Sequence, residues 1–347
     1  MLKVNRPTQR IGFYPEANEP QPPRRQPPKR RKLSPQAMMR LVMMGVCLCV
    51  FITCSVLLIR YFSSIAASRK ASRELEAVYS AALEQTAEPT ASPTAEPTQA
   101  PVVTANPKAT AAPAVRSTPA PSAAELWPST YANNPTLRVS SVFYELQRQN
   151  KDIIGWLKID GVVEEPVLQR DNSYYLTHNA LGQRSVTGAL FLDETCELKK
   201  VPTQMVIHGH NMKEGAMFGS LKKYKVKDAS YYRDHPFIDF NTIYENGRYV
   251  IFAVCEVDIR AGRPDYLPFW HDVRFSSAKA FEEYVSDARA LSHYRCNVDV
   301  SPGDRLLTLS TCTGTDDNKR LLVMARKLRD DENELELKIS ILSTSDR

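Results

Sequence analysis

An uncharged apolar run of nineteen residues, 41–59, limits most strongly what this chain can fold into. Arg40 and Arg60 bracket the run. At a rise of about 1.5 Å per residue, a helix of this length crosses a hydrocarbon core of about 30 Å. The small residues at 66–68 leave a cleaved signal peptide as the alternative, although the apolar part of a signal peptide is normally shorter, about 7–15 residues. We therefore predict an uncleaved transmembrane helix over residues 41–60.

Basic residues are concentrated before this run. Residues 1–40 hold ten Lys and Arg against two Glu, a net charge of +8, whereas the whole chain carries +6 and the remainder therefore −2. The high pI thus belongs to the tail and does not indicate a nucleic-acid-binding domain. Seven basic residues in 21–40 against four in 60–79 predict a cytoplasmic N-terminus. We predict a disordered tail that sets topology; binding of anionic lipid or of a cytoplasmic partner is the alternative.

Three kinds of sequence follow the apolar run. Residues 61–85 are rich in Ala, Glu and Arg and predict a juxtamembrane helix. Residues 86–125 consist largely of Ala, Thr and Pro, a composition that cannot bury a core. We expect a disordered stalk of polyproline character, at up to about 3.1 Å per residue. Residues 126–347 have a globular composition, and we predict that they form a folded extracytoplasmic domain.

Short strand-like runs dominate the globular part. A helix is expected near 140–149, and a longer one over 277–294, with an apolar stripe and Ser276 or Ser277 as its cap. The clearest strands are apolar or β-branched and are bounded by turn residues: 153–159, 189–192, 205–208, 249–257, 305–311 and 321–328. Many short strands with few helices predict a mainly β fold, a barrel or sandwich decorated by helices.

The cysteines outside the apolar run fall into two groups. Cys196, Cys255 and Cys296 are predicted to be free buried thiols, because a domain of about 220 residues can build its own core. An extracellular disulfide among them is the alternative. The chain has no CxxC pair, so the spacing does not indicate a zinc site. Cys312, at the end of a predicted strand, is the remaining thiol.

Three residues carry candidate chemistry. His210 follows a predicted strand and is preceded by a glycine. Cys312 ends another strand, and Arg320 opens the next one after the turn-forming run TGTDDNK. This pattern predicts a β-hairpin that brings Arg320 within side-chain reach of Cys312. The spacing does not show that His210 meets Cys312, since 102 positions separate them.

These residue types suit acyl transfer. A thiolate is the attacking species, a histidine can transfer protons, and an arginine can donate hydrogen bonds to an oxyanion. Each residue also has a plain structural interpretation: a strand-end cysteine as a small buried side chain, a loop histidine or a strand-start arginine as a solvated group. His208 and His210 could also form an H-x-H metal pair, but no third ligand is evident.

The motifs around these residues resemble the sortases, and specifically their class B. The run TLSTC ends at Cys312, with Arg320 eight residues later and the GHN run of His210 upstream. Further class B-like segments occur in order, so that the resemblance covers roughly residues 140–330: IIGWLKI at 153–159, DNSYYL at 171–176, GALFLD at 188–193 and GHNM continuing to MF at 217–218. The helix at 277–294 lies where class B sortases carry an extra helix.

The resemblance implies an eight-stranded sortase β-barrel and a two-step transpeptidation without metal or cofactor. It implies that Cys312 is the nucleophile, His210 the general acid and base, and Arg320 the oxyanion and substrate ligand. The resemblance also implies a groove for the sorting signal that is lined by Asn172, Leu176 and Ser310. The implied partners are secreted proteins with a C-terminal sorting signal and an amine of the peptidoglycan or of a pilin. The implied location is the cell membrane of a Gram-positive-type bacterium, with one span and an extracellular domain.

Two departures from the family pattern bear on the site. His208 stands where sortases commonly have an aromatic residue, and we expect it to be a tolerated neighbour. Gly314 and Thr315 replace a bulkier pair, which leaves the accepted sorting signal open. Alternatives to a wall-anchoring sortase are a pilin-polymerising sortase, a catalytically silent sortase-like module and an unrelated cysteine hydrolase.

Overall fold

The computed structural model divides the chain into two units, 1–57 and 58–347. It describes residues 34–87, 121–225, 228–270, 274–314 and 316–346. The predictions for most of the basic tail, for most of the stalk and for Thr315 therefore lie outside the described residues.

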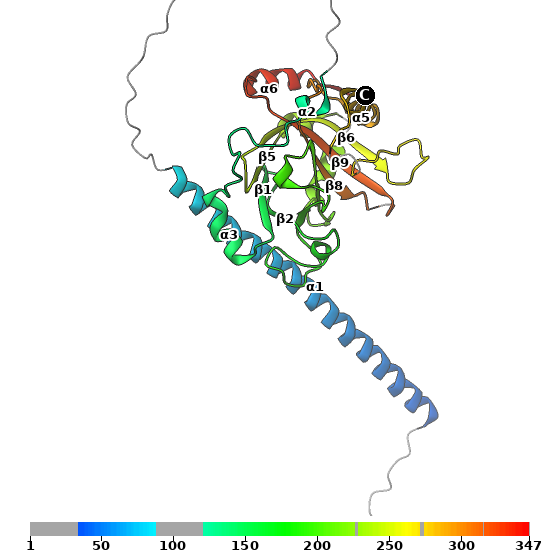
Figure 1. The fold of residues 1–347 in the computed structure, drawn as a ribbon. Coiled ribbons are helices and arrows are strands. Elements are labelled where there is room, and N and C mark those ends of the chain that lie inside the picture. Colours follow the sequence, from blue (N-terminus) through cyan, green and yellow to red (C-terminus); the bar gives the residue numbers. More distant parts are fainter. Residues whose placement is uncertain (1–33, 88–120, 226–227, 271–273, 315, 347) are drawn as a thin grey trace, which may run out of the picture. The chain divides into compact units, whose positions relative to one another are not determined.

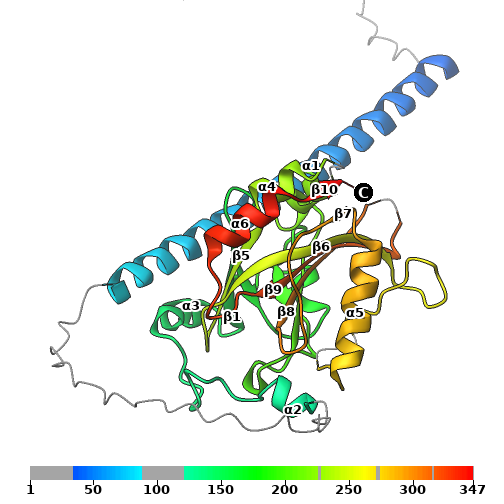
Figure 2. The same ribbon diagram turned by 90° about the horizontal axis from the view of Figure 1, so that it is seen from above.

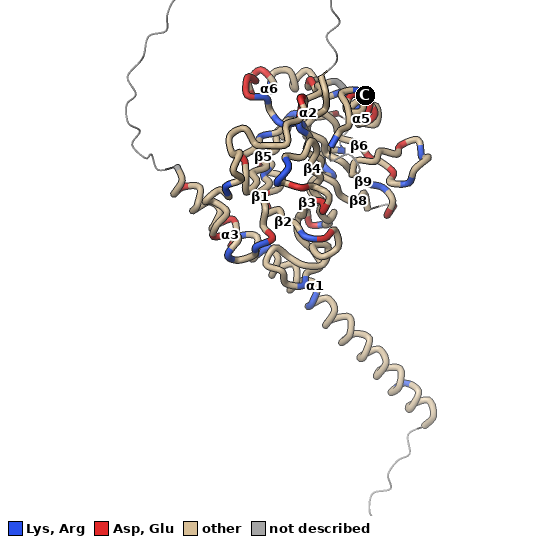
Figure 3. Tube along the Cα trace, in the orientation of Figure 1, with Lys and Arg blue, Asp and Glu red and all other residues tan. Residues whose placement is uncertain are grey.

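A single helix, α1 (Pro35–Ala87), contains both the predicted span and the predicted juxtamembrane helix. Figure 3 shows the long stretch of this helix that carries almost no charge. Within the described part of the chain, α1 is the one helix long and apolar enough to cross a membrane. Its apolar residues in the first unit are exposed.

Eight strands close into a barrel in the order β1-β2-β3-β4-β8-β9-β6-β5 (Figure 1). This confirms the predicted fold class. The strands are β1 (Ile153–Ile159), β2 (Val163–Leu168), β3 (Leu190–Leu192), β4 (Gln204–His208), β5 (Phe237–Thr242), β6 (Arg248–Asp258), β8 (Leu306–Cys312) and β9 (Lys319–Lys327). A separate two-stranded ladder joins β7 (Tyr294–Arg295) to β10 (Ser345–Asp346).

Small helices and single turns connect and cover the strands. The α-helices after α1 are α2 (Ala123–Leu126), α3 (Tyr144–Gln149), α4 (Ser230–Asp234), α5 (Ala278–Leu291) and α6 (Glu334–Leu342). The 3-10 turns are η1 (Ser141–Phe143), η2 (Tyr174–Leu176), η3 (Leu198–Lys200) and η4 (Gly219–Lys225). The helix predicted near 140–149 is thus a 3-10 turn that continues into α3.

The helix α5 forms where its apolar stripe predicts. Ser277 is its N-cap, and its hydroxyl oxygen accepts a hydrogen bond from the amide of Ala280, which satisfies one of the free donors of the first turn. One face is buried, and the helix lies against β6 (Figure 2). The buried residues of this face are Phe281, Tyr284, Val285 and Ala288.

The C-terminal half of α1 packs on the barrel within the second unit. Tyr79 stacks on Trp156 of β1, with ring centroids 4.4 Å apart and planes 11° apart, and its hydroxyl accepts a hydrogen bond from Asn241 of β5 at 2.9 Å. The hydroxyl of Ser72 donates to Glu165 of β2 at 2.6 Å. The buried residues of this helix recur every three or four positions, as one face of a helix requires: Ile65, Ser68, Ala71, Leu75 and Tyr79.

Candidate active site

Parallel pairing of β4 with β8 brings the two halves of the candidate site together. His208 of β4 is in register with Ser310 of β8. Because the carboxyl ends of parallel strands meet at the same edge of a sheet, the residues two positions further along, His210 and Cys312, emerge side by side. Beyond the strands, the side chain of Asn211 donates to the carbonyl of Cys312 at 2.9 Å, which ties the two ends together. The sequence spacing left this meeting undetermined.

The predicted hairpin between Cys312 and Arg320 is confirmed. The strands β8 and β9 pair antiparallel, and Cys312 is the direct partner of Arg320. Directly opposite residues in such a pair project on the same face of the sheet. One guanidinium nitrogen of Arg320, Nη1, donates to the carbonyls of Asp317 and Lys319 in the turn, at 2.6 and 3.1 Å. These bonds hold the side chain and leave its Nε and Nη2 without a hydrogen bond to another described residue.

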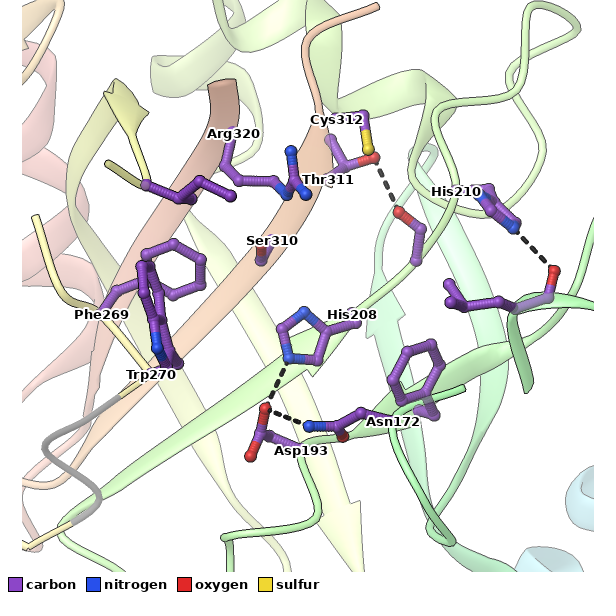
Figure 4. Close-up of a pocket in the computed structure, with 14 residues that line it drawn as sticks. Asn172, Asp193, His208, His210, Phe269, Trp270, Ser310, Thr311, Cys312 and Arg320 are labelled. Atoms are coloured by element: carbon purple, nitrogen blue, oxygen red, sulfur yellow. Dashed lines mark hydrogen bonds and ion pairs between the residues drawn. The ribbon is translucent and has the colours of Figure 1, made fainter. Parts of the chain in front are cut away.

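All six residues that the sequence analysis assigned to the site line one cavity of about 490 Å³ (Figure 4). A volume of this size is typical of ligand-binding sites. The walls are mixed, with polar groups at the strand ends and aromatic rings from the segment that follows β6. The lining consists of Asn172, Leu176, Phe191, Asp193, His208, Gly209, His210, Ile259, Phe269, Trp270, Ser310, Thr311, Cys312 and Arg320.

A backbone carbonyl orients His210. Its Nε2 lies 2.8 Å from the carbonyl oxygen of Leu176, which can only accept, so Nε2 carries the proton. The other ring nitrogen, Nδ1, is then free to accept a proton. Gly188 packs behind this pair: it has a φ of +59°, and a Cβ there would lie 3.0 Å from the same carbonyl oxygen and 3.1 Å from the ring of His210. Only glycine fits this close approach.

Cys312 differs from the other cysteines of the barrel in its exposure. Its side chain is partly accessible, whereas Cys196, Cys255 and Cys296 are buried. All four are free thiols, as predicted for the buried three. Burial raises the pKa of each of the three to about 12, so they stay protonated and unreactive at neutral pH.

His208 is held by a buried carboxylate. Its Nε2 lies 2.9 Å from Oδ2 of Asp193, and the side-chain amide of Asn172 donates to the same oxygen at 3.0 Å (Figure 4). The amide and hydroxyl of Thr195 donate to the other oxygen, Oδ1, at 2.9 and 2.6 Å. Desolvation would raise the pKa of Asp193, but the bonds from His208 and Thr195 outweigh it and lower the pKa to about 2.

This arrangement changes the interpretation of His208. Its Nε2 has a specific partner, Asp193, whereas Nε2 of His210 is bonded to the carbonyl of Leu176. The sequence analysis did not assign Asp193 to the site, nor the aromatic residues Phe269 and Trp270. The GALFLD segment contained the signal for Asp193, since an acid directly after a buried three-residue strand lies at the mouth of the sheet.

Comparisons with known proteins agree with this architecture. A model of the sortase domain matches residues 157–328. Sortase B of Listeria monocytogenes is 37% identical over 187 residues, which cover 53% of this chain and 72% of that protein. Sortase B of Staphylococcus aureus is 27% identical over 191 residues, covering 54% of this chain and 75% of that protein.

Solved structures show the same relationship. Sortase B of Bacillus anthracis in complex with AAEK2 aligns with a TM-score of 0.50 and 28% identity, over 56% of this chain and 86% of that one. A sortase B–substrate complex of Staphylococcus aureus aligns with a TM-score of 0.50 and 26% identity, over 56% and 88%. A closed eight-stranded barrel with a cysteine, a histidine and an arginine at one edge thus defines the class: the chain belongs to the sortase family of cysteine transpeptidases. Within that family its similarities are to class B.

Proposed function

We propose that this chain is an active, membrane-anchored sortase that cleaves a C-terminal sorting signal of secreted proteins and transfers the acyl part to an amine of the cell wall. The observation that supports it most directly is the strand register. Two pairings, β4 with β8 and β8 with β9, put His210, Cys312 and Arg320 in the lining of a single cavity.

In the first half-reaction, Nδ1 of His210 takes the thiol proton of Cys312, and the resulting thiolate attacks the carbonyl carbon of the scissile peptide bond. A C–S bond forms, and the carbonyl oxygen becomes an oxyanion that accepts hydrogen bonds from Nε and Nη2 of Arg320. Collapse of this intermediate breaks the C–N bond. His210 protonates the leaving amine, and a thioacyl-enzyme remains.

In the second half-reaction, an incoming amine attacks the thioester carbonyl. His210, now neutral, takes the proton of the amine through Nδ1, while Nε2 stays bonded to the carbonyl of Leu176. The C–S bond breaks, the thiolate of Cys312 is regenerated, and a new amide bond joins the secreted protein to the acceptor. Asn172, Leu176 and Ser310 contribute to the groove that receives the sorting signal.

The location follows from the long apolar helix. Residues 41–59 would span the membrane once, with the basic tail in the cytoplasm and the barrel outside, as the flanking charges predict. In this orientation the barrel meets secreted proteins and the wall, which are the substrates the proposal requires.

Replacement of the nucleophile tests the proposal. The full-length protein in detergent is incubated with a library of quenched fluorescent peptides and an amine acceptor, and cleavage and thioacyl-enzyme formation are followed by fluorescence and intact-protein mass. We expect Cys312→Ala to lower cleavage by at least about 10³-fold, since no other described thiol lines the cavity.

Cys196→Ala is the matched control, because its thiol is buried outside the cavity. It should retain cleavage. Cleavage by Cys312→Ala at the rate of the unmodified chain would contradict the proposal. So would an unmodified chain that cleaves no peptide and binds no thiol-directed probe at Cys312.

A further inference from the structure

His208 has one ring nitrogen that the fold leaves for a ligand. Asp193 is ionised and can only accept, so the proton between them belongs to Nε2 of His208. Nδ1 of neutral His208 is therefore an acceptor. Figure 4 shows it turned away from Asp193, on the side of Ser310, and it has no hydrogen bond to another described residue.

A second unsatisfied polar atom lies beside it. Ser310 is in register with His208, it is 2% exposed, and its hydroxyl oxygen has no hydrogen-bond partner among the described residues. A buried hydroxyl without a partner costs free energy in the empty protein, and that cost is removed when a ligand supplies the partner. Both residues line the cavity that contains Cys312.

The carboxylate behind His208 limits which ligand fits. The four hydrogen bonds to Asp193 occupy both of its oxygens, so it offers nothing to a substrate directly. Its negative charge nevertheless disfavours a second carboxylate at this end of the cavity. The complementary group is neutral and presents a donor to Nδ1 of His208, as a hydroxyl or a carboxamide does.

The distance to the nucleophile places this contact along the substrate. Ser310 and Cys312 are two residues apart on the same face of β8, which corresponds to about 7 Å. An extended peptide covers the same distance in two residues. The residue that meets His208 therefore lies about two positions from the scissile bond.

We propose that His208 is a specificity-determining residue of this chain: together with Ser310 it selects a hydroxyl or carboxamide side chain about two positions from the scissile bond. Asp193 is its positioning residue, which fixes the ring and its tautomer. This inference rests on the proposed sortase activity and adds to it the chemistry of one substrate position.

Peptides that vary at one position at a time test it. For the full-length protein in detergent at one fixed pH, kcat/KM is measured for Ser, Thr, Asn or Gln at each position, against Val, Leu, Asp or Glu. At the position read by His208, we expect the unmodified chain to prefer the neutral polar residues by at least about fivefold, the discrimination of one good hydrogen bond.

His208→Gln is the direct variant. Gln keeps a donor near Asp193 but lacks the acceptor of Nδ1, so we expect the ratio of kcat/KM between the neutral polar and the aliphatic peptides to fall to about one. Asp193→Asn leaves one oxygen as an acceptor for His208, Asn172 and Thr195, which in the unmodified chain donate to two oxygens. We expect this variant to reduce the same preference by raising the KM of the preferred peptides. The double variant should be no worse than the poorer single one, because both act on one contact. His235→Gln is the matched control, a half-buried histidine outside the cavity.

The outcomes separate the two proposals. If the unmodified chain cleaves peptides and His208→Gln retains its full preference, or if the preferred residue at that position is acidic or aliphatic, the role of His208 is refuted and the sortase activity stands. If the unmodified chain cleaves no peptide, both fall. Melting temperatures identify a variant that fails to fold, and in that case the remaining variant decides.

Discussion

Gly188 occupies a position that no other residue fits. Its φ of +59° lies in the left-handed region, and a Cβ would approach the carbonyl oxygen of Tyr175 to 2.4 Å. The neighbouring carbonyl of Leu176 is the acceptor that orients His210. We expect Gly188→Ala to displace this carbonyl and to lower kcat/KM for peptide cleavage by at least about tenfold, which is part of the roughly 10²–10⁴-fold that general acid–base catalysis contributes.

Gly262→Ala separates this effect from backbone strain. Gly262 has a similarly positive φ of +83°, but a Cβ there would have nothing within 4 Å. We expect the Gly262→Ala protein to be slightly less stable than the unmodified chain and to retain its activity. Equal activity of the two variants would show that the Leu176 carbonyl does not matter for His210.

At this scale the sequence predicted contacts that are local in the chain. A turn-forming run between two apolar segments fixes the register of a hairpin, which is why the pairing of Cys312 with Arg320 could be expected. The meeting of His210 with Cys312 depends on the parallel pairing of two distant strands, and only the family resemblance predicted it. The bond between Asp193 and His208 also joins separate strands, and because the family pattern has no histidine there, neither argument predicted it.

Among the elements, α1 shows what a propensity argument omits. Residues 61–85 predict a helix by composition, and the structure shows that the helix also has a buried face against the barrel. The regular spacing of Leu75 and Tyr79 with earlier small residues was the available signal. The strands β2 and β5 were not predicted. Two glutamates and Pro166 interrupt the first, and in the second the low strand propensity of Asp239 and Asn241 outweighed their alternation with apolar residues.

The contact of α1 with β2 makes stability depend on pH. Desolvation raises the pKa of Glu165 from 4.5 to about 7; the bond from Ser72 opposes this, and the charge of Glu76 adds to it. Because the folded-state pKa is raised, this contribution to stability is fully present below the ordinary pKa and is lost as the pH rises to about 7. We expect the melting temperature to fall by roughly 10 °C between pH 4.5 and 7.5.

Glu165→Gln should remove that part of the pH dependence, since the amide stays neutral and can still accept from Ser72. Glu84→Gln is the control, an exposed glutamate on the same helix. The role given to Glu165 would be contradicted if the melting temperature of the unmodified chain rose over this pH range and if Glu165→Gln changed with pH in the same way as the unmodified chain.

For the molecule as a whole, the reactivity of the four barrel thiols measures how well the folded barrel excludes solvent. Cys196, Cys255 and Cys296 are buried with pKa values raised to about 12, whereas Cys312 is partly accessible in the cavity. We expect iodoacetamide to modify Cys312 of the folded protein at least about 100-fold faster than any of the three, as measured by mass spectrometry of the peptides. Addition of a denaturant should make all four react alike.

Cys312→Ala serves as the control for this labelling, because it should leave the barrel of the folded protein unlabelled. Disulfide-linked peptides among the buried three would contradict the free thiols seen in the structure, and so would labelling of one of them at the rate of Cys312.

The pairing of β4 with β8 has a consequence for biogenesis. Gln204 of β4 meets Leu306 of β8 across roughly a hundred residues of chain, so this pairing closes a long loop and is slow to form compared with the β8–β9 hairpin. If the barrel is exported in the proposed orientation, a polypeptide that is still emerging from its translocation channel would hold His210 without Cys312. Under the proposed roles, the nucleophile would gain its base only when nearly all of the chain has been delivered, which would protect the nascent protein from premature acylation.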